Sequence, residues 1–275
     1  MPIRIRIGFI PMGDVEQSTA RIAELAEALA VAVDAEVVPH RASDYRGLVA
    51  ALEQGAVQVA WVPPLIAARP IRAGTILPIA VAVRSGSTSY SAALIARNDS
   101  PIVTPADLRG VRAAWVDRES ASGYLAIRLA LRATGLSLVD AFAHEVFARS
   151  HAEVARLVAS GAVDVGATYL NWSPDRTSVE RAGWMGVPGL DPTCIRVVSE
   201  AGPIPSDMFA VHAGLRKAVV QALEAALIDG RPRGARRIAR QLTESDGFVR
   251  PTRDHLAMLE LLGATQDTRT SATRK

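Results

Sequence analysis

Apolar strands alternate with amphipathic helices along most of this chain, and this alternation restricts the possible folds more than any other feature. The isoleucine-rich segment Ile3–Ile10 precedes residues 18–33, in which Ile22, Leu25 and Leu29 recur at helical spacing. Further strands are expected at residues 36–39, 57–62 and 76–84, with helical segments between them. A β-α-β-α-β-α-β order favours a mostly parallel sheet flanked by helices.

The same pattern starts again near residue 90. Strands are expected at residues 90–97, 111–117, 145–148, 163–169 and 195–199, with helices at 122–134, 151–160, 214–227, 233–243 and 253–262. The polar segments 84–89 and 171–190 are candidate crossovers between two units, and the polar residues 264–275 form a tail. We therefore expect a two-lobed α/β protein, with residues 1–85 plus 191–275 in lobe 1 and residues 86–190 in lobe 2. A ligand cleft is expected between the lobes.

Composition fits a globular protein and excludes several other classes. The 275 residues are 49% hydrophobic and 21% charged, with a net charge of +3. The arginines are scattered except between residues 231 and 240, where a solvated helix face is favoured over nucleic-acid contact. The single cysteine excludes an internal disulfide, and no apolar run is long enough to span a membrane. Without a secretion signal the chain is expected to be cytoplasmic, or periplasmic if a leader has been removed.

The segment Val111–Asp117 followed by Ser120-Ala-Ser-Gly-Tyr124 predicts an anion site. A strand ends here and a helix begins after a short turn. The first N–H groups of a helix lack carbonyl partners and carry partial positive charge. Ser120 and Ser122 add hydroxyl donors, and Gly123 would let a ligand approach the backbone. Ordinary capping of a surface helix is the alternative interpretation.

Four stretches of the chain resemble a known family. They are Asp44–Trp61, Tyr90–Ala96, Asp107–Tyr124 and Ser150–Gly166, and they occur in the family's order within a match from about Ile7 to Ala226. The family is that of the ABC-transporter substrate-binding proteins for phosphate, phosphite and phosphonate. The resemblance implies the type II periplasmic-binding-protein-like fold, in which two lobes close about a hinge.

The resemblance also implies a set of ligand-binding residues. These are Tyr45, Tyr90, Ser120, Ala121, Ser122, Gly123, His151 and Asp207. Convergent hydroxyl, amide and imidazole donors suit a tetrahedral oxyanion. Each residue also has a purely structural interpretation: the tyrosines could cover a surface, His151 could cap its helix, and Asp207 could belong to a turn.

The sequence departs from the family pattern at three points. Ala121 replaces a hydroxyl residue, Gln58 replaces an aspartate, and no acidic residue is evident near Asn171. The lost donor and the absent carboxylate argue against an aminoalkylphosphonate as the ligand.

Three functions remain open. The first is a binding protein for a small anion, with an ABC-transporter permease or a signalling protein as its partner. The second is an enzyme of this fold that acts on a small carboxylate, similar to chorismate dehydratase, and the third is the effector domain of a regulator. The chain lacks HExxH, CxxC, GxSxG and Walker motifs, which favours binding over catalysis, and no cofactor or metal is expected.

Overall fold

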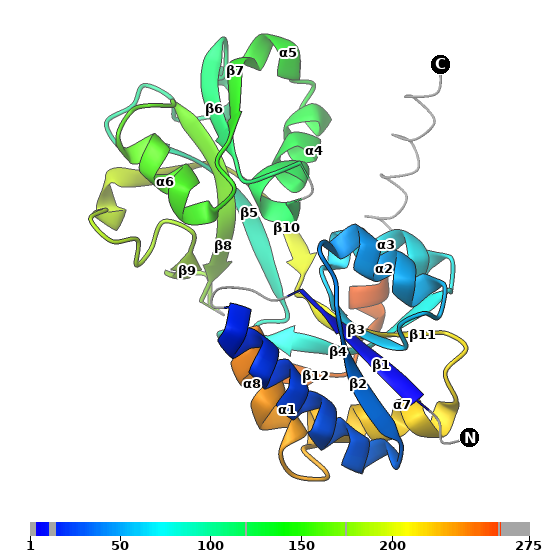
Figure 1. Cartoon of the computed structure of the whole chain (residues 1–275). Helices are drawn as coiled ribbons and strands as arrows, with labels where there is room; N and C mark the ends of the chain where they lie inside the picture. The colour runs from blue at the N-terminus through cyan, green and yellow to red at the C-terminus, as the bar shows by residue number, and fades with distance from the viewer. Residues whose placement is uncertain (1–3, 11–14, 119, 174, 258, 260–275) are drawn as a thin grey trace. The chain divides into compact units, whose positions relative to one another are not determined.

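The computed structural model describes residues 4–10, 15–118, 120–173, 175–257 and 259, and the chain forms two compact units. Unit 1 comprises Met1–Thr88 and Pro205–Lys275, and unit 2 comprises Ser89–Ile204. The chain therefore passes twice from one unit to the other (Figure 1). None of the helices in these described ranges combines the length and apolar character needed to cross a bilayer.

Unit 1 contains a six-stranded mixed sheet in the order β12-β4-β11-β3-β1-β2. The strands are β1 (Arg4–Phe9), β2 (Glu36–Arg41), β3 (Val59–Val62), β4 (Ile76–Val83), β11 (Met208–His212) and β12 (Gly247–Val249). Strand β1 runs parallel to β2 and β3, whereas β11 runs antiparallel to both β3 and β4. β1, β2, β3 and β4 therefore share one direction, and their carboxyl ends lie at one edge of the sheet.

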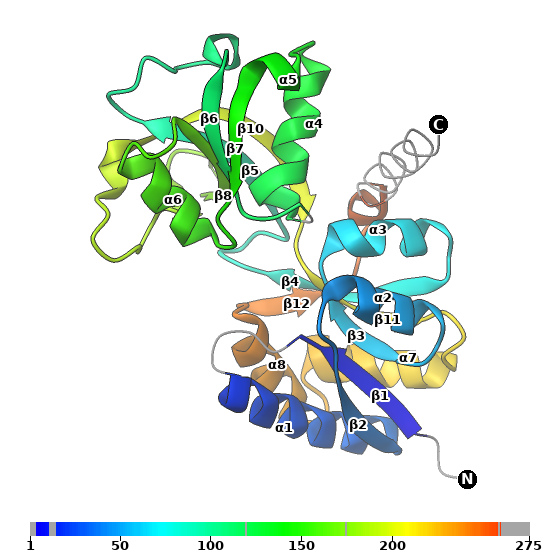
Figure 2. The ribbon, with the colours of Figure 1, turned by 45° about the horizontal axis from the view of Figure 1, so that its top comes forward.

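Helices cover both faces of this sheet (Figure 2). They are α1 (Val15–Val33), α2 (Tyr45–Glu53), α3 (Pro64–Arg72), α7 (Lys217–Glu224) and α8 (Ala235–Thr243), with a π-helical turn η4 (Ala225–Asp229) and a helical stretch at residues 253–257. Leu25 and Leu29 of α1 pack with Ile7 in one core. Leu48 and Leu52 of α2 belong to a second core on the other face.

Unit 2 contains a sheet in the order β10-β5-β8-β6-β7, with β9 paired to β8. The strands are β5 (Ser89–Arg97), β6 (Val111–Trp115), β7 (Phe142–Phe147), β8 (Val165–Trp172), β9 (Val179–Ala182) and β10 (Ile195–Pro205). The helices are α4 (Ala126–Ala133), α5 (Leu138–Ala141) and α6 (His151–Ala159), with short turns η1 (Pro105–Asp107), η2 (Ala121–Leu125) and η3 (Pro192–Cys194). Strand β6 is parallel to β7 and β8, and β5 is antiparallel to β8.

The expected architecture of two sheets flanked by helices is confirmed, but the structure differs from the sequence-based expectation at the crossovers. Residues 171–190 hold the end of β8 and all of β9 rather than a crossover. Strand β10 joins β5 in unit 2, so the second passage between units lies at Ile204–Pro205. The segment before β5 includes a turn in which the backbones of Arg84 and Ser87 pair. The expected tail at 264–275 lies outside the described residues.

Helix α6 packs closely on β8 at Gly166, and this contact predicts a measurable loss of stability on substitution. A Cβ at Gly166 would lie 2.5 Å from Val154 Cγ1 and 3.0 Å from Val158 Cγ2. We expect Gly166→Ala to lower the free energy of unfolding by about 1–3 kcal/mol, because the helix must move off the sheet. Urea unfolding followed by circular dichroism measures the change.

Gly47→Ala is the matched control. Gly47 lies within α2, and its nearest contact to an added Cβ is Asp44 Oδ1 at 3.4 Å. Alanine is the better helix former, so this variant should match or slightly exceed the parent stability. Equal stability of the parent and Gly166→Ala would contradict the packing described for α6.

Candidate functional site

The candidate site of unit 2 lies where the parallel strands β6 and β7 end. Trp115, the last residue of β6, is in register with Phe147, the last residue of β7. The loops that follow remain paired, because Ala148 N–H donates to Trp115 O at 2.7 Å and Arg149 N–H donates to Val116 O at 2.8 Å. The turn at residues 120–123 and the start of α6 therefore occupy the same edge of the sheet.

Ser120 caps a π-helical turn, η2, that leads into α4. Its Oγ accepts a hydrogen bond from Gly123 N–H at 3.0 Å, and its carbonyl accepts one from Leu125 N–H at 3.0 Å. Ser122 is buried, and within the described ranges its hydroxyl has no hydrogen-bond partner. The N–H groups of Ala121 and Ser122 likewise find no acceptor there. Amides at a helix start together with a hydroxyl that has no protein partner form a set of donors suited to an anion. The helix expected over residues 122–134 is thus a π turn followed by α4.

Gly123 has a different role from the expected one. A Cβ there would lie 2.6 Å from Val116 Cβ and 2.7 Å from Ser120 Oγ. The missing side chain therefore faces the protein rather than a ligand. Glycine at this position lets the turn pack against the end of β6.

His151 is the first residue of α6, but it does not cap the helix. The cap is Ser150, whose Oγ accepts a hydrogen bond from Glu153 N–H at 3.1 Å. The imidazole Nδ1 lies 3.0 Å from Thr168 Oγ1, and the ring meets the Tyr169 ring edge-on at 5.0 Å. Burial lowers the pKa of His151 to about 4, against the opposing charge of Asp117. The imidazole is consequently neutral at neutral pH.

Tyr90 lies at the same edge of unit 2. It is near the start of β5, which runs antiparallel to β8 so that Ser91 pairs with Leu170. The carboxylate of Glu200 in β10 accepts hydrogen bonds from Ser91 Oγ at 2.6 Å and Trp172 Nε1 at 3.1 Å. From the sequence, no acidic residue was expected near Asn171. In the folded chain, however, Glu200 contacts Trp172, the residue that follows Asn171. Neither Glu200 nor Thr168 was identified from the sequence, because both act through residues distant in the chain.

Tyr45 and Asp207 lie at the corresponding edge of unit 1. Tyr45 begins α2, which is capped by Asp44 through a 2.7 Å bond from Gly47 N–H. Arg84 at the end of β4 contacts Asp207, with Nη2 3.5 Å from Oδ2. Burial raises the pKa of the Tyr45 phenol, Asp207 raises it further, and Arg84 lowers it, so all three groups are close. Sequence reasoning missed Arg84, which it placed in a flexible polar segment.

The expected site residues therefore form two sets. Tyr45 and Asp207 belong to unit 1, whereas Tyr90, His151 and the turn 120–123 belong to unit 2. Each set lies at the carboxyl edge of its own sheet. The structure describes each unit by itself, so the joining of the two sets into one site remains a prediction.

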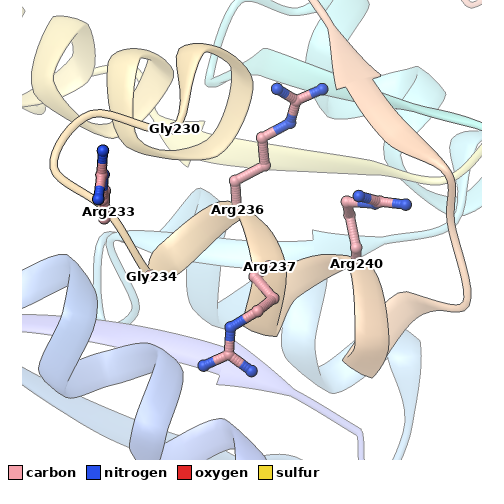
Figure 3. A pocket seen from close by; sticks show the side chains of 6 residues that line it. All are labelled: Gly230, Arg233, Gly234, Arg236, Arg237 and Arg240. Carbon is pink, nitrogen blue, oxygen red and sulfur yellow. The ribbon is translucent and has the colours of Figure 1, made fainter.

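The arginine cluster of unit 1 lies elsewhere, around the start of α8. A hollow of about 440 Å³ is lined by Gly230, Arg233, Gly234, Arg236, Arg237 and Arg240. Figure 3 shows that the arginine side chains spread in different directions instead of converging on one point. The opposite face of α8, with Ile238 and Ala239, packs into the core. This geometry agrees with a solvated helix face.

The described residues offer little for metal chemistry. Within those ranges, no three His, Cys, Asp or Glu side chains lie close enough to hold a metal ion. The turn at residues 120–123 and His151 instead offer neutral hydrogen-bond donors, which can bind and orient an anion.

Comparison with known proteins extends this description. A family model described as the periplasmic substrate-binding protein of phosphonate ABC transporters matches residues 7–256. XAC2383 from Xanthomonas citri, solved bound to ATP, is 23% identical with a TM-score of 0.77 over 97% of this chain and 98% of its own. PhnD1 from Prochlorococcus marinus, solved with methylphosphonate, is 18% identical with a TM-score of 0.66 over 97% and 99%.

A third solved structure has the same fold. It is a binding protein component of an ABC phosphonate transporter from Pseudomonas aeruginosa, 18% identical with a TM-score of 0.64 over 100% of both chains. At these identities the likeness establishes the two-lobed fold.

The neutral His151 predicts a specific pH dependence of stability. The unfolded chain takes up a proton on this residue near pH 6.5, whereas the folded protein does so only near pH 4. Acidification through this interval favours the unfolded state, so stability falls as the pH decreases. Between about pH 7 and 4.5, the parent should lose about 2 kcal/mol more unfolding free energy than His151→Gln.

His144→Gln is the matched control, because His144 is exposed on β7. This variant should keep the parent's pH dependence. Parallel stability curves for the parent and His151→Gln, or an imidazole NMR titration of His151 near 6.5, would contradict the buried neutral ring.

Proposed function

This chain belongs to the family of periplasmic substrate-binding proteins of ABC phosphonate transporters, and we propose that it binds a phosphorus oxyanion between its two units. The family role is to bind a small anionic solute and to work with an ABC permease. The finer proposal is that phosphate, phosphite or a phosphonate is the solute. We propose the periplasm, the compartment of the family, as the place where this chain acts.

The hydrogen-bond donors at the start of η2 support the binding of the ligand's oxyanion group in unit 2. The N–H groups of Ala121 and Ser122 and the Ser122 hydroxyl, which have no protein partner among the described residues, are the observation that carries it. Ser120 uses its oxygen lone pair to hold Gly123 N–H, which leaves its hydroxyl proton for a ligand. The helix dipole adds favourable potential for a negative charge.

His151 would supply a further donor from the neighbouring loop. When Thr168 donates to Nδ1, the proton of the neutral ring resides on Nε2. The Nε2–H group then donates to a ligand oxygen without placing a second full charge in the site. In this arrangement the Thr168 hydroxyl positions the imidazole ring.

Unit 1 would close on the ligand from the other side. Tyr45 and Asp207 are the residues proposed for this contact, and Tyr90 stands beside the first passage between units. The passages at Thr88–Ser89 and Ile204–Pro205 would act as the hinge. Binding by closure has the advantage that water is excluded from the hydrogen bonds to the anion.

A thermal-shift panel tests the proposal directly. The purified chain is heated with phosphate, phosphite, methylphosphonate or sulfate, and a true ligand at about 100 times its dissociation constant should stabilise it by about 2.7 kcal/mol. Ser122→Ala should weaken the binding of that ligand by about tenfold, because one charge-assisted hydrogen bond is lost. Isothermal titration calorimetry measures the affinity.

Ser160→Ala is the matched control, since Ser160 is exposed at the opposite end of α6 and should bind like the parent. Equal affinity of the parent and Ser122→Ala would refute the assignment of the site. Product formation from chorismate would replace the binding function with an enzymatic one.

A further inference from the structure

Carboxylates at the site edges of both units are already paired with arginines of the same unit. In unit 1 the pair is Arg84–Asp207, with 3.5 Å between Nη2 and Oδ2. In unit 2 the pair is Arg176–Glu200, with 3.1 Å between Nη2 and each carboxylate oxygen. Neither arginine was singled out by the sequence analysis, and neither pair belongs to the oxyanion donors described above.

The position of Arg84 does not depend on Asp207 alone. Its Nη2 also donates to Thr243 O at 2.9 Å, and its Nε donates to Glu244 O at 3.3 Å. The following residue is held as well, because Ser85 N–H donates to Asp246 at 2.6 Å. The side chain of Arg84 is only 19% exposed. The guanidinium is thus fixed beside Asp207 by the backbone that precedes β12.

The carboxylate of Glu200 accepts more hydrogen bonds than that of Asp207. Besides Arg176, it accepts hydrogen bonds from Ser91 Oγ at 2.6 Å and Trp172 Nε1 at 3.1 Å. The guanidinium of Arg176 also lies over the Trp172 ring, 5.4 Å from the ring centroid. Each of the two carboxylate oxygens therefore already has at least two donors.

Three further carboxylates among the residues that the structure describes also have partners near these edges. Asp44 and Asp246 each accept a backbone N–H, from Gly47 and Ser85. Asp117 acts on His151, so it lies at the oxyanion end rather than beside Asp207. An ammonium group on the remote part of a ligand would therefore meet carboxylates whose charge an arginine has already balanced.

We infer that Arg84 and Arg176 set the ligand specificity of this protein, by cancelling the charge of Asp207 and Glu200 so that oxyanions without a cationic group are preferred. This inference rests on the proposed function, and it names the ligand class: phosphite, phosphate and alkylphosphonates rather than aminoalkylphosphonates. An ammonium ion would lose its hydration on entering the site, and only a carboxylate freed from its guanidinium could replace that hydration. The arginines thus lower the affinity for aminoalkylphosphonates rather than raise the affinity for the preferred oxyanions.

Arg84→Gln tests the inference, because it frees Asp207 and retains a polar side chain. Burial raises the pKa of Asp207 and Arg84 lowers it, so the titrations are run above neutral pH to keep the freed carboxyl ionised. The affinities for methylphosphonate and 2-aminoethylphosphonate are measured by calorimetry for the parent and the variant. The parent should prefer methylphosphonate by at least about tenfold. In the variant, the affinity for 2-aminoethylphosphonate should rise by about tenfold, and the affinity for methylphosphonate should change by less than about threefold.

Two further variants separate charge from structure. Arg84→Lys keeps the positive charge and should keep the parent's preference. Arg84→Gln combined with Asp207→Asn removes the freed carboxylate and should abolish the gain. Arg176→Gln provides an independent change in unit 2. The Arg176 side chain is 62% exposed, so we expect the variant to fold. It should shift the preference in the same direction as Arg84→Gln.

The outcomes distinguish the inference from the function on which it rests. If the parent binds neither compound, nor phosphate or phosphite, the proposed function fails. If the parent binds methylphosphonate but binds 2-aminoethylphosphonate equally well, the specificity inference fails while the function stands. It also fails if Arg84→Gln and Arg176→Gln, both folded by circular dichroism, leave the ratio of the two affinities unchanged.

Discussion

The shared direction of neighbouring strands is the constraint on which the candidate site depends. In unit 2, β6 and β7 run parallel, so the turn that opens η2 and the start of α6 must emerge at one edge of the sheet. In unit 1, β1 runs parallel to β2 and β3, so α2 begins at the corresponding edge. Each crossover helix therefore presents its amide end at that edge of its own sheet, before any side chain is considered. The serines and His151 add to a donor set that the topology has already created.

The donors proposed for an oxyanion in unit 2 are neutral groups, and their neutrality has an energetic reason. A buried cation without its ligand would be an uncompensated charge and would destabilise the unliganded protein. Amide groups, a serine hydroxyl and a neutral imidazole have a smaller desolvation penalty when no ligand is bound. His151 belongs with them because burial keeps its pKa at about 4. Arg84 and Arg176, two of the cations at the site edges, are both paired with carboxylates.

Local patterns in the sequence were sufficient for most of the elements and for the position of the serine turn, although β9, α5 and β12 were not expected. Helical spacing, capping residues and apolar runs are short-range signals, and the turn at Ser120 is contained within a few residues. Two long-range contacts at the site edges were not predictable in this way: the Arg84–Asp207 ion pair joins residues 123 apart, and the Ser91–Glu200 hydrogen bond joins residues 109 apart. They meet because β4 pairs with β11 and because β5 is next to β10. The same strand order explains why the strand expected at residues 195–199 was placed in lobe 1 although β10 belongs to unit 2. An isolated apolar segment does not specify the strand with which it pairs.

Gly123 shows how a residue can be selected for a reason that the packing contradicts. A glycine beside two serines suggests room for a ligand, yet the space for its Cβ is occupied by Val116 and Ser120. Gly183 behaves similarly, because a Cβ there would overlap Thr168 Oγ1 and lie 2.9 Å from His151 Cβ. Both glycines therefore set the position of a candidate ligand-binding group by permitting close packing behind it. The positions of the proposed donor groups are thus set by packing on the side of the site that faces the protein core. A sequence pattern contains no interatomic distances, so this packing could be found only in the folded structure.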